Sequence, residues 1–289
     1  MSSDEVGTVR ARRRERARRH GPSAFGDDLQ RFTNLTLTLA TTDFKLRYFG
    51  SALGYLWSIT RPLMTFAVLL VVFTHVFHFA SKVEHYPEFL LFGVVLFGFF
   101  QEATTMSVGS IVGHEAVVRK TQFPRLVIPL AVVVTTLFNL MLNLVVAFAF
   151  ILASGISPRW SWLGLFPLLA ALFVFTTAVS MIVSALYPRF RDVSIIWSVL
   201  AMALFYATPV LYPVWAVTSG LRNVIALNPL APIFDLAQRW ITVPSTPPPT
   251  AESMGGPVRF AVAIGIYLAV CVLAVWIFRR EAPRIAEEL

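Results

Sequence analysis

Six long apolar stretches dominate this sequence. They run from Leu63 to Ala80, from Tyr86 to Met106, from Leu126 to Ser154, from Leu163 to Leu186, from Val193 to about Val210, and from Phe260 to Phe278. A transmembrane helix needs about 20 consecutive, mostly apolar residues. The stretches are continuous and lack the alternation of barrel strands. The sequence therefore predicts an all-α integral membrane protein with six transmembrane helices.

The composition agrees with this class. Hydrophobic residues make up 56% of the chain and charged residues 14%, against about 45–50% and about 25% in soluble domains. The formal net charge is +8. In a membrane protein we attribute such an excess to topology and to contact with anionic lipid, and we expect no nucleic-acid partner.

The chain has three lysines, Lys45, Lys82 and Lys120, and none of them follows a glycine. A P-loop reads G-x-x-x-x-G-K-[ST], because its lysine must reach the phosphates that the glycine-rich backbone holds. We therefore expect no cofactor in this chain. If the protein moves a substrate uphill, a separate ATPase must bind the ATP and Mg²⁺.

Basic residues are unevenly shared between the connecting loops. The N-terminal region and alternate loops carry most of them, namely Lys45, Arg47, Arg119, Lys120, Arg125, Arg189, Arg191, Arg279, Arg280 and Arg284. The other loops carry Lys82, Arg159, Arg222 and Arg239. By the positive-inside rule both termini are predicted to be cytoplasmic.

The ends of the chain differ in composition from its middle. Residues 1–27 are rich in arginine, and polar sequence, not the apolar core of a secretory signal, follows them. We expect a disordered basic cytoplasmic tail over 1–27, a transmembrane permease domain over 28–280 and a short cytoplasmic tail over 281–289.

A predicted amphipathic helix precedes the first apolar stretch. On one helical face lie Phe32, Leu35, Leu39 and Leu46, and on the others lie Arg31, Asp43, Lys45 and Arg47. This pattern favours an interfacial helix along the cytoplasmic membrane surface. The alternative is a short soluble helix packed on a partner.

The region 211–242, after the fifth stretch, is apolar but interrupted. Pro209 and Pro213 precede and open it, and Pro229 and Pro232 follow. Because proline breaks helical hydrogen bonding, we expect half-helices that re-enter from the outer face, buried by protein. The alternative is an amphipathic extracellular subdomain.

Three stretches together resemble a known family. They are 44–58 (FKLRYFGSALGYLWS) leading through 61–63 (RPL), 118–126 (VRKTQFPRL), and 206–213 (YATPVLYP) with 228–230 (NPL). The chain resembles, over roughly residues 30–280, the permease subunits of type-two ABC exporters for polysaccharides, the Wzm/TarG-like group. Those proteins export O-antigen, teichoic acid or cell-wall galactan on a polyprenyl-pyrophosphate carrier.

The resemblance implies partners and a place in the bacterial inner membrane. We expect two copies of an ABC ATPase, a second copy of this chain and a lipid-linked polysaccharide. Residues 109–121 resemble the coupling helix that docks on the ATPase, with an ordinary charged loop as the alternative. The residues assigned to coupling are Glu115, Arg119, Lys120 and Arg125. A drug or small-lipid permease of the same fold remains an alternative function, as does, with less support, a polyprenyl-dependent transferase.

Two further groups of residues are predicted to meet the substrate. The cations Lys45, Arg47 and Arg61 flank the first stretch, where they would bind the carrier's pyrophosphate or, alternatively, generic lipid headgroups. Polar and aromatic side chains in or near the stretches are predicted to line a channel or gate, with helix contacts and interfacial anchoring as the alternatives. They are Tyr55, Trp57, Glu102, Asn139, Asn143, Trp197, Phe205 and Tyr206.

Overall fold

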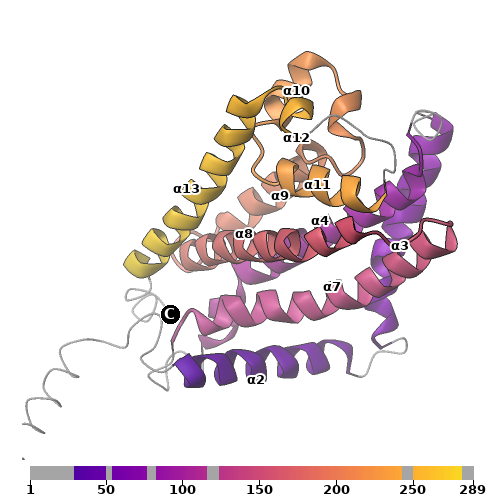
Figure 1. The fold of residues 1–289 in the computed structure, drawn as a ribbon. Coiled ribbons are helices and arrows are strands. Elements are labelled where there is room, and N and C mark those ends of the chain that lie inside the picture. Colours follow the sequence, from indigo (N-terminus) through magenta and orange to yellow (C-terminus); the bar gives the residue numbers. More distant parts are fainter. Residues whose placement is uncertain (1–28, 50–53, 77–82, 116–123, 243–249, 282–289) are drawn as a thin grey trace, which may run out of the picture.

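The computed structural model describes residues 29–49, 54–76, 83–115, 124–242 and 250–281, and they form helices joined by turns, with no strand among them (Figure 1). The α-helices are α2 (Leu29–Tyr48), α3 (Leu56–Val71), α4 (Tyr86–Val108), α5 (Ser110–Gly113), α7 (Val127–Ala153), α8 (Leu165–Leu186), α9 (Val193–Ala207), α10 (Ser219–Ile225), α11 (Ala231–Ile241), α12 (Thr250–Ser253) and α13 (Pro257–Glu281). A π-helical turn, η1 (Val72–Val76), extends α3, and the 3₁₀ turns η3 (Trp160–Gly164) and η4 (Val214–Ala216) precede α8 and α10.

Five helical segments are long and apolar enough to cross a membrane. They are Leu56–Val76, Tyr86–Val108, Val127–Ala153, Trp160–Leu186 and Pro257–Glu281. The fifth predicted stretch corresponds to α9, which is apolar but has only 15 residues. These findings confirm an all-α integral membrane protein.

The helix α9 is shorter than the sequence predicted, because it ends at Ala207 and not near Val210. Thr208 adopts an extended backbone conformation, with φ −93° and ψ 142°. The next residue is Pro209, whose ring disfavours a helical conformation in the residue before it. At 1.5 Å per residue α9 is about 22 Å long, less than the ~30 Å thickness of a bilayer's hydrocarbon core.

The centre of the molecule is α4, which packs against α3, α7, α8, α9 and α11. Most of its side chains are buried, including Phe92, Phe97 and Phe100. Figure 1 shows α4, α7 and α8 running side by side, with α13 leaning on α8. A helix that is apolar all round and surrounded by others is the expected core element of a membrane bundle.

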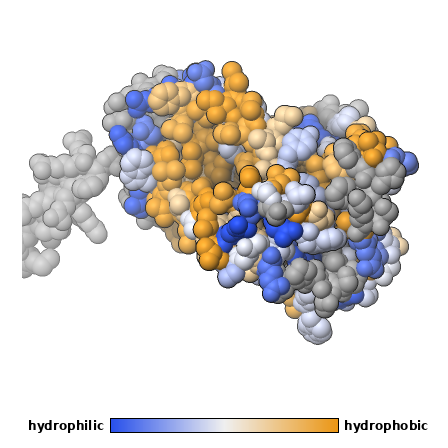
Figure 2. All heavy atoms as spheres, turned by 90° about the horizontal axis from the view of Figure 1, so that it is seen from above, coloured by the Kyte–Doolittle hydropathy of each residue, from blue (hydrophilic) through white to orange (hydrophobic). Residues whose placement is uncertain are grey.

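The helices α3, α9 and α13 bury few residues and expose large apolar side chains. On α9 and α13 these include Ile195, Val199, Met202, Leu268 and Val272. Figure 2 shows a broad hydrophobic area on the side of the molecule where these two helices lie. Exposed apolar area of this extent suits contact with lipid or with another membrane-embedded chain.

The helix α2 runs along the first half of α7. The Thr135 hydroxyl donates to the Ala40 carbonyl at 3.1 Å, and the Phe44 and Phe138 rings meet edge-on with centroids 5.6 Å apart. Phe32 and Leu39 pack against a cluster at the start of α7 and the end of α13. The predicted helix is confirmed, while its position at a membrane surface stays a prediction.

The predicted face of α2 is partly wrong. Leu46 is exposed, whereas Asp43 and Arg47, which the sequence pattern placed on a polar face, are half-buried against the bundle. A heptad spacing assigns Leu46 to the predicted stripe, but the buried residues of α2 are Thr36 and Ala40. Asp43 and Arg47 follow them at helical spacings of three and four, so the buried stripe runs through these positions and leaves Leu46 at its edge.

The interrupted region folds into the short helices α10 and α11. Asn228 connects the residue after α9 to the residue before α11. Its Nδ2 donates to the Thr208 hydroxyl at 2.8 Å, and its Oδ1 accepts from the Leu230 amide at 2.9 Å. Gln238 of α11 donates to the Phe89 carbonyl of α4 at 3.5 Å. These bonds satisfy polar groups that the breaks between helices leave free.

Candidate functional site

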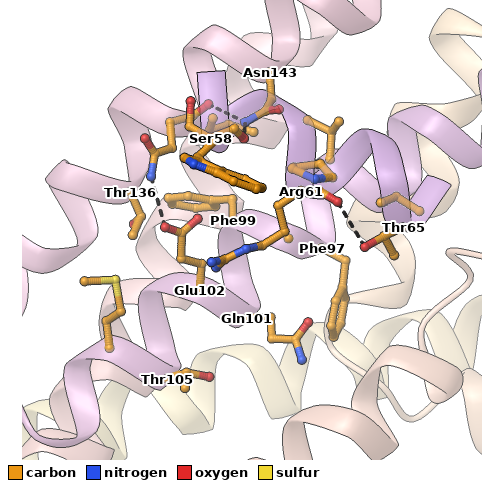
Figure 3. Close-up of a pocket in the computed structure, with 18 of the residues that line it drawn as sticks. Ser58, Arg61, Thr65, Phe97, Phe99, Gln101, Glu102, Thr105, Thr136 and Asn143 are labelled. Atoms are coloured by element: carbon orange, nitrogen blue, oxygen red, sulfur yellow. Dashed lines mark hydrogen bonds between the residues drawn. The ribbon is translucent and has the colours of Figure 1, made fainter. Parts of the chain in front are cut away.

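A cavity of about 440 Å³ lies between α3, α4 and α7. Figure 3 shows polar side chains from all three helices around it. The structure brings seven of the predicted site residues to its wall, namely Arg47, Trp57, Arg61, Glu102, Asn139, Asn143 and Phe205. Their separation along the chain is large, so only the packing of the helices unites them.

Glu102 of α4 joins three helices at this cavity. Its Oε1 accepts a hydrogen bond from Asn139 Nδ2 of α7 at 2.9 Å and forms an ion pair with the Arg47 guanidinium of α2. The two charged side chains are only 27% and 25% exposed. A carboxylate in this setting is costly unless it is paired and hydrogen-bonded, and both conditions are met.

Arg61 of α3 is in a different situation. Figure 3 shows its side chain extending into the cavity on the side of Glu102. Among the described residues, no carboxylate lies within 4 Å of its guanidinium. Arg61 thus presents a positive charge to the cavity, whereas the charge of Arg47 is balanced by Glu102.

Asn143 lies one turn after Asn139 on α7 and is buried. Its Nδ2 donates to the Ser58 carbonyl of α3 at 3.0 Å and to the Asn139 carbonyl at 2.8 Å. The two asparagines therefore bind neighbouring helices and also line the cavity. The two interpretations of these residues, helix contact and cavity wall, describe the same geometry.

The predicted aromatic residues separate into three places. Trp57 and Phe205 line the cavity, and the Phe205 ring packs edge-on against Phe97 with centroids 5.2 Å apart. Tyr55 and Tyr206 are exposed and do not line it. Trp197 belongs to the core beside Phe100 and does not line the cavity.

A second cavity of about 270 Å³ lies between α2, α5 and α7. The His114 Nδ1 lies 2.9 Å from the Ser110 carbonyl, and its Nε2 lies 3.8 Å from Asp43. Burial raises the pKa of the Asp43 carboxyl, and the nearby His114 opposes this rise. Arg47 and Met106 line both cavities, so they form the partition between them.

The remaining predicted residues lie away from the large cavity. Lys45 is exposed and lines neither cavity. Glu115 follows α5, and Arg125 directly precedes α7, where burial lowers the pKa of its guanidinium. Arg119 and Lys120 lie outside the described residues. Within the described part, no group of three or more His, Cys, Asp or Glu side chains is arranged to hold a metal.

Sequence reasoning missed several wall residues, among them Gly98 and Thr105 of α4. Gly98 lies four residues before Glu102 and Thr105 lies three residues after it, and this helical spacing is the signal that could have assigned them to one face. It also missed Asp43 and His114, because nothing in their sequence positions indicates that α2 and α5 meet.

A sequence model of the ABC-2 type transporter matches residues 34–240. The chain belongs to this family. It is 33% identical over 199 residues to the O-antigen export system permease protein RfbA of Klebsiella pneumoniae, covering 68% of this chain and 76% of that protein. It is 32% identical over 206 residues to RfbA of Myxococcus xanthus, covering 70% and 78%. The polysialic acid transport protein KpsM of Escherichia coli is 21% identical over 214 residues, covering 74% and 82%.

The resemblance predicted from the three sequence stretches is confirmed by these matches. The protein is a multi-pass transmembrane permease of the ABC-2 type and not an ATPase. Permeases of this family work with an ATPase partner.

Proposed function

We propose that this permease exports a polysaccharide, carried on a polyprenyl-pyrophosphate lipid, from the cytoplasmic side across the inner membrane of a bacterium. The polymers considered are those of the resembling exporters: O-antigen, teichoic acid or cell-wall galactan. Two of the relatives are named as O-antigen export permeases, which supports a polysaccharide substrate.

The observation that carries the proposal is the composition of the large cavity. It combines Arg61, which pairs with no carboxylate of the described residues, with the ring of Trp57 and the amide of Gln101. Arginine binds phosphate oxygens in a bidentate manner. Aromatic faces and amides are the groups that contact sugar rings and hydroxyls. The cavity therefore suits the junction between a pyrophosphate and the first sugars.

The assembly that we propose has two copies of this chain and two ATPase subunits. Each copy crosses the membrane six times, with both termini in the cytoplasm, α2 at the cytoplasmic interface, and α10 and α11 re-entering from the outer side. Residues 109–121, including Glu115, meet the ATPase together with Arg125. This segment is connected to the large cavity, because α5 and α2 both line the second cavity, whose wall includes Arg47.

The first test replaces Arg61 by Gln in the complex of the permease with its ATPase. We expect the concentration of lipid-linked glycan that half-maximally stimulates ATP hydrolysis to rise at least tenfold, or ~1.4 kcal/mol in binding free energy. The matched control is Lys45→Gln, which removes one positive charge outside the cavity and leaves this concentration within about twofold. Equal effects of the two variants would mean that these cations attract lipid headgroups only.

The second test concerns orientation. Asn223 on α10 is exposed, and a cysteine placed there in a Cys271→Ser background is expected to react with a membrane-impermeant thiol reagent added to the periplasmic side. A cysteine at Phe190, exposed between α8 and α9, serves as the opposite control and is expected to react only after the membrane is opened. The reverse pattern would invert the proposed topology.

A further inference from the structure

The helix α3 contains a proline in its interior, at Pro62. A residue at this position normally donates its amide to the carbonyl four residues earlier, which here belongs to Ser58. Proline has no amide hydrogen, so that carbonyl loses its helical partner. The position lies at the wall of the large cavity, where both Ser58 and Pro62 are lining residues.

The missing donor is supplied by another helix. Asn143 of α7 donates from Nδ2 to the Ser58 carbonyl at 3.0 Å, and the same Nδ2 lies 2.8 Å from the Asn139 carbonyl. The amide side chain is buried, and its own helix holds it in place through the second contact. A buried carbonyl without a partner is costly, so this bond replaces an interaction that α3 cannot make for itself.

The bond matters because the segment of α3 and η1 is the least buried of the five long apolar helices. Phe66 is the only residue of α3 that is buried, and much of the remaining helix presents exposed apolar side chains. In a lipid environment, apolar contact with a neighbouring helix is worth little more than contact with acyl chains, so packing and interhelical hydrogen bonds decide position. Arg61 is adjacent to Pro62, and Trp57 is adjacent to Ser58, so the bond acts next to both residues.

We infer that Asn143 is a positioning residue, which replaces the amide that Pro62 lacks and thereby holds Arg61 and Trp57 of α3 in the cavity. The role in recognition rests on the proposed function of that cavity, whereas the link between Asn143 and Pro62 does not. Asn143 acts through the backbone of α3, and its amide nitrogen is already engaged by two carbonyls.

The test is a double-mutant cycle of Asn143→Ala and Pro62→Ala. Asn143→Ala alone is expected to raise the half-stimulating concentration of lipid-linked glycan about tenfold. In a Pro62→Ala background the new amide bonds to the Ser58 carbonyl, so the same change is expected to have less than a twofold effect. Asn143→Leu, which keeps the approximate size of the side chain but has no donor, is expected to behave like Asn143→Ala. The matched control pairs Asn143→Ala with Pro129→Ala. Pro129 lies in the first turn of α7, where a backbone amide introduced by alanine has no acceptor within the helix.

A second readout does not depend on the substrate. Spin labels at the exposed positions Leu56 on α3 and Val145 on α7, in a Cys271→Ser background, report the distance between the helices. The distance distribution is expected to broaden in Asn143→Ala and to narrow again in the double variant. Additive effects of the two substitutions on this distribution would overturn the inference. If the two substitutions have coupled effects on the distance but leave the half-stimulating concentration unchanged, the link between Asn143 and Pro62 stands and the proposed function of the cavity is rejected.

Discussion

Replacing Glu102 by Ala is expected to lower the free energy of unfolding by about 2 kcal/mol, because it leaves Arg47 without its carboxylate and Asn139 without its acceptor. This loss is smaller than the about 3–5 kcal/mol that removing one partner of a fully buried ion pair typically costs. The reason is that about a quarter of each side chain is exposed. Export is expected to fall to about a tenth or less, because the partition between the two cavities opens.

A double-mutant cycle that combines Glu102→Ala with Arg47→Ala isolates the interaction between these two side chains from their other contacts. We expect the double variant to be more stable than the sum of the single losses implies, with a coupling free energy of about 1–2 kcal/mol. The measurement is thermal or denaturant unfolding of the permease in lipid nanodiscs. The matched control is the cycle of Arg189 and Glu281, whose charged atoms lie 3.8 Å apart with Arg189 47% exposed. Its coupling is expected to stay below about 0.5 kcal/mol. Strict additivity at Arg47 and Glu102 would show that the pair contributes nothing as a pair.

Replacing Gly93 by Ala is expected to destabilise the packing of α4 against the interrupted region by about 2–3 kcal/mol. A Cβ atom at this position would lie 2.7 Å from Gln238 Nε2 and 3.0 Å from the Val210 carbonyl oxygen. The glutamine side chain has room to move only by giving up its bond to the Phe89 carbonyl, and Val210 presents backbone. A valine at position 93 is expected to have the larger effect of the two substitutions.

The control for Gly93 lies on the same helix. A Cβ at Gly98 meets nothing within 4 Å, so Gly98→Ala is expected to be neutral or to stabilise by up to about 1 kcal/mol through helix propensity. Both variants are compared by thermal unfolding in the same lipid. Equal stability of the two alanine variants would mean that α11 and the segment after α9 can move away from α4 without a loss in the free energy of unfolding.

The site residues illustrate how far pattern reasoning extends. Glu102, Asn139 and Asn143 were selected because polar groups inside apolar stretches need partners or a cavity. The structure gives each of them both. Lys45 was predicted as a cation at the headgroup level and Trp197 as an aromatic residue of the channel, yet Lys45 is exposed away from the cavity and Trp197 is part of the core. Residue type and depth predict that a side chain needs a partner, but they do not say on which side of a helix the partner lies.

The sequence alone determined the class of this protein and the approximate extent of its long helices. Continuous apolar runs of sufficient length have one common solution in lipid, an α-helix that satisfies its own backbone. It also predicted that a separate subunit binds the ATP, because a P-loop is a local chemical motif and this sequence does not contain it.

Only the tertiary structure decided which side chains share a cavity. The Arg47–Glu102 pair joins residues 55 positions apart by chain number, and the bond from Asn143 to Ser58 spans 85. Such contacts depend on the rotation of each helix about its axis and on which helices are neighbours. In α2 the apolar pattern selected Leu46, whereas packing buries the stripe of Thr36 and Ala40, which continues to Arg47. Because small angular differences are settled by packing against α4 and α7, the cavity could not be read from any one segment.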